Sequence, residues 1–229
     1  MTNSTTTLTP WPVQIETSGT VINGDLATPA DARGLVVFVH GSGSSRHSPR
    51  NRAVAGVFLQ ARLATLLLDL LTGDEERADA VTAALRFDIP FLANRVMLAV
   101  DWTRLQPPIE SLPLGLFGAS TGAAAALMVA AERPSVVRAV VSRGGRPDLA
   151  GAALERVSAP TLLIVGGRDE VVLELNRQAL ARLRGEKQLV VVPRATHLFE
   201  EPGALDQVAR LATDWFVRHL TKLSDPDSR

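Results

Sequence analysis

The sequence predicts one α/β domain with a mostly parallel, doubly wound sheet and helices on both of its faces. Three observations predict it: compact apolar runs, helical segments that alternate with those runs, and a length that suits a single core. The 229 residues are 46% apolar and 21% charged, as in ordinary globular proteins. We expect the domain to span residues 13–222, between a flexible leader (1–12) and a flexible tail (223–229).

Six apolar runs predict the strands of the buried sheet. Each run is apolar at consecutive positions, which is typical of parallel strands that helices cover on both faces. The runs are residues 35–39, 65–70, 114–117, 137–141, 161–165 and 188–192. Ahead of them, residues 13–16 and 20–26 flank Ser18-Gly19 and predict an antiparallel hairpin at the sheet edge.

Helical spacing of apolar residues predicts the helices that alternate with these strands. The segments are residues 52–62, 91–105, 121–132, 171–183 and 204–220. Only residues 142–160 separate two core strands after the third of these helices, which is too short for a helical cap. Residues 71–90 are the other candidate cover. We therefore expect no cap domain.

The pentapeptide Gly118-Ala119-Ser120-Thr121-Gly122 matches the G-x-S-x-G motif of a nucleophilic serine. It follows a predicted strand and opens an Ala-rich helix, the context in which a serine sits on a sharp turn between small residues. A helix N-cap serine beside turn glycines is the alternative. The strand-to-helix context favours Ser120 as the nucleophile.

A serine hydroxyl needs a base that accepts its proton, and the chain has four histidines. His40 and His47 precede Ser120, and His219 lies near the end of the last predicted helix, where a cation suits the helix dipole. His197 follows the last predicted strand, at the edge where α/β active sites lie. It is the predicted general base, and a loop histidine bonded to backbone is the alternative.

Asp169 is the predicted acid that orients the histidine. It lies between Ser120 and His197 in the chain, directly after a predicted strand, in the order that the motif requires. Glu170 is the competitor. For both, the alternative is an acid that caps the helix after it.

Two backbone N–H groups are expected to stabilise the oxyanion. Thr121, directly after the nucleophile, supplies one, and Ser42 in the Gly/Ser-rich turn 40–45 supplies the other. A phosphate-binding loop is an alternative for this turn, but the sequence has neither G-x-G-x-x-G nor the P-loop lysine.

Taken together, four segments resemble the α/β hydrolases of the dienelactone hydrolase-like group: 40–46 (HGSGSSR), 118–122 (GASTG), 166–169 (GGRD) and 195–199 (ATHLF). The resemblance implies a lidless, α/β-hydrolase-fold enzyme of bacterial origin that acts on small esters or lactones. Dienelactone hydrolases proper use a cysteine nucleophile, whereas this chain has Ser120 and no cysteine. The expected activity is therefore that of a general carboxylesterase. A lactonase, thioesterase or amidase on the same triad, and a non-catalytic α/β binding module, are the alternatives.

Three further residues are candidates for contacts with the substrate. Arg143, at the end of a predicted strand, could bind a carboxylate; surface charge or pairing with Asp148 is the alternative. Phe87 and Phe91 could line the pocket or pack in the core.

The expected partner is a small-molecule ester, without a cofactor, a metal, nucleic acid or a membrane. The 24 basic and 24 acidic residues balance, so charge indicates no polyanion. Residues 1–12 lack the basic start and apolar core of a signal peptide, and no later apolar run is long enough to span a membrane, so we expect a cytoplasmic protein. The oligomeric state stays open.

Overall fold

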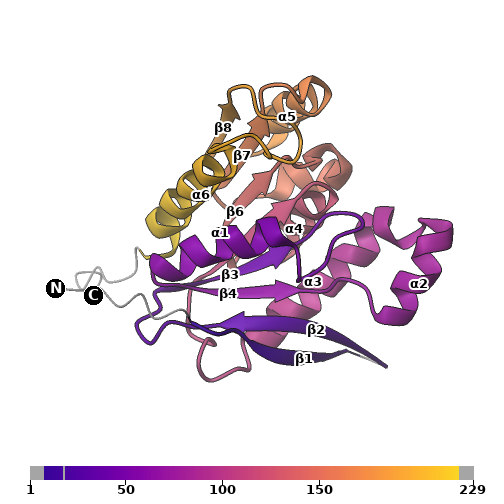
Figure 1. The fold of residues 1–229 in the computed structure, drawn as a ribbon, viewed down its shortest axis with the longest axis vertical. Coiled ribbons are helices and arrows are strands. Elements are labelled where there is room, and N and C mark those ends of the chain that lie inside the picture. Colours follow the sequence, from indigo (N-terminus) through magenta and orange to yellow (C-terminus); the bar gives the residue numbers. More distant parts are fainter. Residues whose placement is uncertain (1–7, 18, 222–229) are drawn as a thin grey trace.

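The computed structural model describes residues 8–17 and 19–221, which form an eight-stranded sheet with helices on both faces (Figure 1). The strands are β1 (Trp11–Thr17), β2 (Thr20–Ala27), β3 (Gly34–Val39), β4 (Leu63–Leu68), β5 (Leu114–Ala119), β6 (Val137–Arg143), β7 (Thr161–Gly166) and β8 (Lys187–Val192). Their order is β1-β2-β4-β3-β5-β6-β7-β8. β2 pairs antiparallel with β1 and β4, and the other neighbours are parallel. The predicted sheet and its leading hairpin are confirmed.

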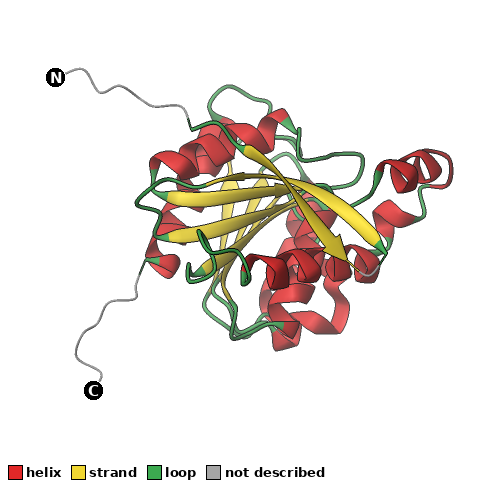
Figure 2. Ribbon diagram, turned by 90° about the horizontal axis from the view of Figure 1, so that it is seen from below, coloured by secondary structure: helices red, strands yellow, loops and turns green. Residues whose placement is uncertain are grey.

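Helices cover the sheet in two layers (Figures 1 and 2). The α-helices are α1 (Pro49–Gln60), α2 (Gly73–Thr82), α3 (Ile89–Thr103), α4 (Thr121–Glu132), α5 (Glu170–Arg182) and α6 (Ala204–Leu220), and the 3-10 helices are η1 (Leu85–Phe87) and η2 (Pro147–Arg156). α1 and α6 pack on one face, and α3, α4, α5 and η2 pack on the other. Within the described residues, no helix is both long and apolar enough to cross a membrane.

β3 shows why its residues read as one continuous apolar run. Leu35 and Val37 face the layer of α3 and α4, while Val36 and Phe38 face the layer of α1 and α6. Every position is therefore buried, as a strand between two helical layers requires. The parallel register sets Val39, the last residue of β3, opposite Gly118 in β5, so the loop after β3 begins beside the turn after β5.

Three short helices, α2, η1 and η2, were not expected from apolar periodicity. α2 buries only Asp79 among its residues, so it carries no apolar stripe that could indicate a helix. Its start is instead stabilised by a capping box between Thr72 and Glu75. α2 and η1 occupy the segment 71–90 considered as a cover, and η2 packs on α4 between β6 and β7. Over residues 8–17 and 19–221, the fold has no cap domain, as expected.

The start of the sheet differs from the expected boundary. β1 begins at Trp11, inside the predicted leader, because Trp11 and Pro12 continue the antiparallel pairing opposite Leu26 and Asp25. The rest of the predicted leader up to residue 7, and the predicted tail 223–229, lie outside the described residues.

Candidate active site

Ser120 occupies the sharp turn between β5 and α4. Its φ of 50° and ψ of −123° lie in a region that residues other than glycine rarely adopt. A Cβ at Gly118 would lie 2.5 Å from Ala123 Cα, and one at Gly122 would lie 2.3 Å from His40 O, so the turn needs both glycines. The Ser120 side chain does not cap helix α4. It therefore does not play the structural role that was the alternative for this motif.

Asp169 and His197 are brought together from the ends of two neighbouring strands. Asp169 follows β7 and precedes α5, and its Oδ2 lies 2.6 Å from Nδ1 of His197, in the loop after β8. With Nδ1–H donated to the carboxylate, Nε2 keeps its lone pair. The Asp169 side chain does not cap α5. The competitor Glu170 is the first residue of α5, and the hydrogen bond to the imidazole is made by Asp169.

The backbone after β6 lies against both the predicted nucleophile and the histidine. The Ser120 N–H donates to Arg143 O at 3.3 Å, and the Arg146 N–H donates to Ser120 O at 3.0 Å. Between them, Gly144 has a φ of 51°, and a Cβ there would lie 3.0 Å from His197 O and 3.7 Å from its Cε1. Segment 143–146 thus links the sharp turn at Ser120 to the loop that carries His197. A side chain at residue 144 would crowd that loop.

The two residues expected to form the oxyanion hole are adjacent. The Ser42 N–H donates to Thr121 Oγ1 at 3.0 Å, and the two hydroxyl oxygens are also 3.0 Å apart. The Ser42 hydroxyl donates to the carbonyl of Arg86 at 3.2 Å. Gly41 packs directly on the nucleophile, since a Cβ there would lie 2.8 Å from Ser120 Cβ. Sequence reasoning considered only the N–H of Thr121 and missed its hydroxyl, which pairs with Ser42.

His40 has a structural role at the end of β3. Its Nε2 accepts the Leu70 N–H at 3.1 Å, and its Nδ1 lies 2.9 Å from Gly41 O. Burial lowers the pKa of His40, against a smaller opposing effect of the hydrogen bond to the Gly41 carbonyl. The ring therefore stays neutral and links the loop of residues 40–47, which contains Ser42 and is called the oxyanion loop below, to the segment that follows β4. Its place before a glycine at the end of a strand was the only signal in the sequence.

Arg143 is a buried cation. It is 7% exposed and donates to Asn51 Oδ1 in α1 at 3.3 Å. Burial, together with the nearby charge of Arg50, lowers the pKa of Arg143 to about 10. Arg146, not Arg143, pairs with Asp148. Arg143 therefore has neither of the two structural roles considered for it, and its contact with a substrate stays a prediction.

The two candidate phenylalanines lie in different environments. Phe87 in η1 is 59% exposed. Phe91, in the first turn of α3, packs partly into the core and lies 5.0 Å below the guanidinium of Arg95. For both, contact with the substrate stays a prediction.

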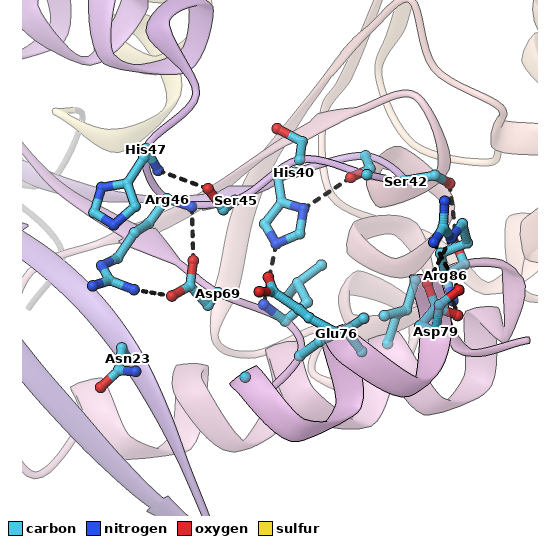
Figure 3. Close-up of a pocket in the computed structure, with 17 residues that line it drawn as sticks. Asn23, His40, Ser42, Ser45, Arg46, His47, Asp69, Glu76, Asp79 and Arg86 are labelled. Atoms are coloured by element: carbon cyan, nitrogen blue, oxygen red, sulfur yellow. Dashed lines mark hydrogen bonds and ion pairs between the residues drawn. The ribbon is translucent and has the colours of Figure 1, made fainter. Parts of the chain in front are cut away.

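A cavity of about 500 Å³ opens beside the oxyanion loop (Figure 3). The loop 40–47, the end of β4 and helix α2 form most of its wall. Two ion pairs stand in this wall, Arg46 with Asp69 and Arg86 with Asp79. Within the described residues, no group of three or more histidines and carboxylates is placed to hold a metal ion.

Comparison with known proteins places the chain among hydrolases. Residues 22–222 match the dienelactone hydrolase family. The crystal structure of a dienelactone hydrolase from Anabaena variabilis is 56% identical, with a TM-score of 0.92 over 93% of this chain and 99% of that one. Est1E from Butyrivibrio proteoclasticus shares the fold, with a TM-score of 0.77 at 16% identity over 92% of this chain and 99% of that one.

A curated relative carries a different name. A putative phosphoribosyl transferase of Mycobacterium tuberculosis is 60% identical over 208 residues, which are 91% of this chain and 46% of that protein. The chain thus spans about half the length of this relative. The family match extends over most of the chain, from β2 to the end of α6, and includes every residue of the candidate site. The chain belongs to the dienelactone hydrolase family of α/β hydrolases.

Proposed function

We propose that the protein hydrolyses small carboxylic esters through an acyl-enzyme, as a serine carboxylesterase. The observation that carries the proposal is the 2.6 Å hydrogen bond between Asp169 and His197, which segment 143–146 links to a serine held on a strained turn. The bond directs the Nε2 lone pair of His197 away from the carboxylate, which is the tautomer that a general base needs.

In the proposed reaction, Ser120 Oγ attacks the ester carbonyl carbon while His197 Nε2 takes the hydroxyl proton. The C–O bond to the alcohol then breaks, and the alcohol leaves with that proton. A water molecule then attacks the acyl-enzyme and gives a proton to Nε2, which passes it to Ser120 Oγ as the acyl C–O bond breaks and the acid leaves. The Asp169 carboxylate stabilises the imidazolium in both steps.

The oxyanion of each tetrahedral intermediate would accept hydrogen bonds from the backbone N–H groups of Thr121 and Ser42. The Ser42 N–H donates to the Thr121 hydroxyl in the free enzyme. In this proposal it exchanges that oxygen for the substrate oxygen, so the amide stays hydrogen-bonded before and during the reaction.

The direct test is labelling with a fluorophosphonate, followed by hydrolysis of p-nitrophenyl acetate. We expect the unmodified protein to be labelled at Ser120 and to turn over the ester. Ser120→Ala should lose both properties, and His197→Ala should lose turnover by several orders of magnitude. An unlabelled, inactive but folded protein would instead indicate a non-catalytic binding module.

The leaving group is the part of the proposal that the triad does not select. Lactones, thioesters and amides would react through the same steps, so a matched panel with one acyl group distinguishes them. We expect the oxygen ester to have the highest kcat/KM. If the lactone or the thioester has the higher kcat/KM, the protein would be a lactonase or a thioesterase that works by the same mechanism.

We attribute the name of the longer mycobacterial relative to its other half. The chain spans about half the length of that protein, and residues 22–222 match a hydrolase family. Hydrolysis is therefore the activity that we propose here.

A further inference from the structure

We propose that the cavity beside the oxyanion loop binds an uncharged, polyhydroxylated arm of the ester, such as a monosaccharide. This inference rests on the proposed function and names the substrate class for it. It draws on the place of the cavity, the chemistry of its wall and the balance of charge around it.

The cavity lies beside the oxyanion loop, which packs on the nucleophile, although Ser120 itself is not one of the residues that line the cavity. Gly41 and Ser42 both line it, and a Cβ at Gly41 would lie 2.8 Å from Ser120 Cβ and 3.6 Å from Ser120 Oγ. An ester whose carbonyl oxygen points to Ser42 would therefore extend one of its two arms into this space. At about 500 Å³, the cavity has room for a single sugar ring.

Most of the side chains that line the cavity are polar. Of the 17 residues that line it, the apolar side chains are Leu70, Leu71 and Leu92, and three more residues are glycines. Leu70 is fully buried and offers little surface. An alkyl chain placed here would remove water from the polar groups without replacing their hydrogen bonds.

Several of these polar groups are available to a ligand. Within the described residues, the side chains of Glu76, Asn23 and Ser44 make no hydrogen bond or ion pair, and Glu76 and Asn23 are exposed to solvent. Arg46 and Asp69 bind each other. In the view of Figure 3, that ion pair lies between Asn23 and Glu76. Acceptors and donors spaced around a cavity match the alternating hydroxyls of a sugar.

The balance of charge favours a neutral ligand over an anion. Arg46 is held by Asp69 and Asp25, and Arg86 is held by Asp79. Among the described residues that line the cavity, Glu76 is the carboxylate without a cationic partner. A phosphate or carboxylate in the cavity would therefore meet an uncompensated negative charge. Hydroxyl groups can donate to that carboxylate without a charged partner.

The test compares two acetates of primary alcohols that differ only in ring hydroxyls. These are 6-O-acetyl-1,5-anhydro-D-glucitol and (tetrahydropyran-2-yl)methyl acetate. We expect kcat/KM to be at least about tenfold higher for the sugar ester, a ratio that corresponds to about 1.4 kcal/mol. Glu76→Gln should reduce this ratio at least about threefold, because a charged acceptor is replaced by a neutral one. Glu110→Gln, an equal change of charge at an exposed site outside the cavity, should leave the ratio unchanged.

Two further acetates identify the charge that the cavity accepts. A monophosphate of the sugar ester and acetylcholine should both have lower kcat/KM than the neutral sugar ester. Equal rates for the sugar and tetrahydropyran esters would overturn the inference, as would preference for the phosphate or the ammonium ester, or a ratio that Glu76→Gln leaves unchanged. Hydrolysis of p-nitrophenyl acetate in the same preparation separates the two proposals, since its loss would contradict the esterase function itself.

Discussion

Asp169 and Glu170 are adjacent acids, and only the fold distinguishes their roles. Asp169 bonds to His197, while Glu170 begins α5. We expect Asp169→Asn to reduce kcat by orders of magnitude, because an amide no longer holds the imidazole in the required tautomer or stabilises its charge. Glu170→Gln is the matched control and should stay within about twofold in a p-nitrophenyl acetate assay. The reverse pattern would reassign the acid.

Thr121 is expected to position the oxyanion loop through its side chain. It is 5% exposed, and its hydroxyl accepts the Ser42 N–H and lies 3.0 Å from the Ser42 hydroxyl. Because the Ser42 N–H exchanges this oxygen for the substrate oxygen in the proposed reaction, the contact that holds the loop throughout is the one between the two hydroxyls. We expect Thr121→Val, which keeps the shape and removes the hydroxyl, to lower kcat about tenfold or more with little change in KM. Thr121→Ser should restore most of the rate. A fall in melting temperature that Thr121→Ser also shows, without the split between kcat and KM, would mark the residue as merely structural.

Arg143 carries a charge that burial makes costly. Burial lowers the pKa of Arg143 to about 10 in the folded protein, and the shift from the ordinary value of an arginine corresponds to roughly 3 kcal/mol against the charged form. The folded-state pKa is the lower one, so this cost is complete below about pH 10 and falls as the pH rises from there toward the ordinary pKa of the side chain. We expect Arg143→Met to raise the free energy of unfolding at pH 7 by about 1 kcal/mol, after loss of the Asn51 hydrogen bond.

The same variant tests the predicted contact of Arg143 with a substrate carboxylate. If the guanidinium binds that group, esters with a free carboxylate should lose their advantage over neutral isosteres in Arg143→Met, while hydrolysis of neutral esters persists. Such a carboxylate would belong to the arm outside the cavity, because Arg143 does not line it. Equal kcat/KM for the two ester types in the unmodified enzyme would remove Arg143 from the substrate site.

At the scale of the element, α2 and η1 are held together mainly by one carboxylate. Asp79 accepts hydrogen bonds from the Leu85 and Arg86 N–H groups and from Arg86 Nε, at 2.6 to 3.1 Å. Burial acts to raise the pKa of Asp79, but the hydrogen bonds from Arg86 and Leu85 outweigh it and hold the pKa below its ordinary value. The Asp79–Arg86 pair also holds part of the cavity wall in place, because the Arg86 carbonyl accepts a hydrogen bond from the Ser42 hydroxyl.

This arrangement predicts a pH-dependent opening of residues 73–88. Because the folded-state pKa is lowered, its stabilising effect is present above the ordinary pKa of about 4 and is lost as the pH falls below it. We expect Asp79→Asn to speed amide hydrogen exchange in this segment at pH 7, with the core strands unchanged. Asp74→Asn, on the same helix in an exposed pair with Arg77, should have little effect. Equal exchange in both variants would contradict this role of Asp79.

At the scale of the whole molecule, the absence of a cap domain predicts the range of acyl chains. β6 and β7 are joined by η2, which packs on α4, and the cavity beside the oxyanion loop measures about 500 Å³ with mostly polar side chains in its wall. We expect p-nitrophenyl butyrate to have a higher kcat/KM than the laurate, because the long chain would remain in water. The enzyme should also show no interfacial activation, which means no abrupt rise in rate once the substrate exceeds its solubility and forms droplets or micelles. A preference for laurate would refute an open, lidless site.

The elements that could be predicted from the sequence are those whose pattern reflects burial. The buried strands and the helices α1, α3, α4, α5 and α6 all pack against the core. Their apolar residues therefore recur along the sequence in the pattern of the element that they form. α2 and η1 are stabilised by a capping box and by Asp79, so their signal is polar and local. Apolar periodicity could not find them.

The residues of the candidate site could be predicted from their order along the chain and from their places after the predicted strands. Ser120, Asp169 and His197 each follow a strand of a parallel sheet, and a parallel sheet brings the ends of its strands to one edge. Choices among neighbours needed the tertiary structure, because they depend on side-chain direction. Asp169 rather than Glu170 faces the imidazole, the Thr121 hydroxyl meets Ser42, and Arg143 turns into the layer of α1. The cavity is likewise a tertiary feature, because its wall combines β2, the oxyanion loop, β4 and α2, which are distant in sequence.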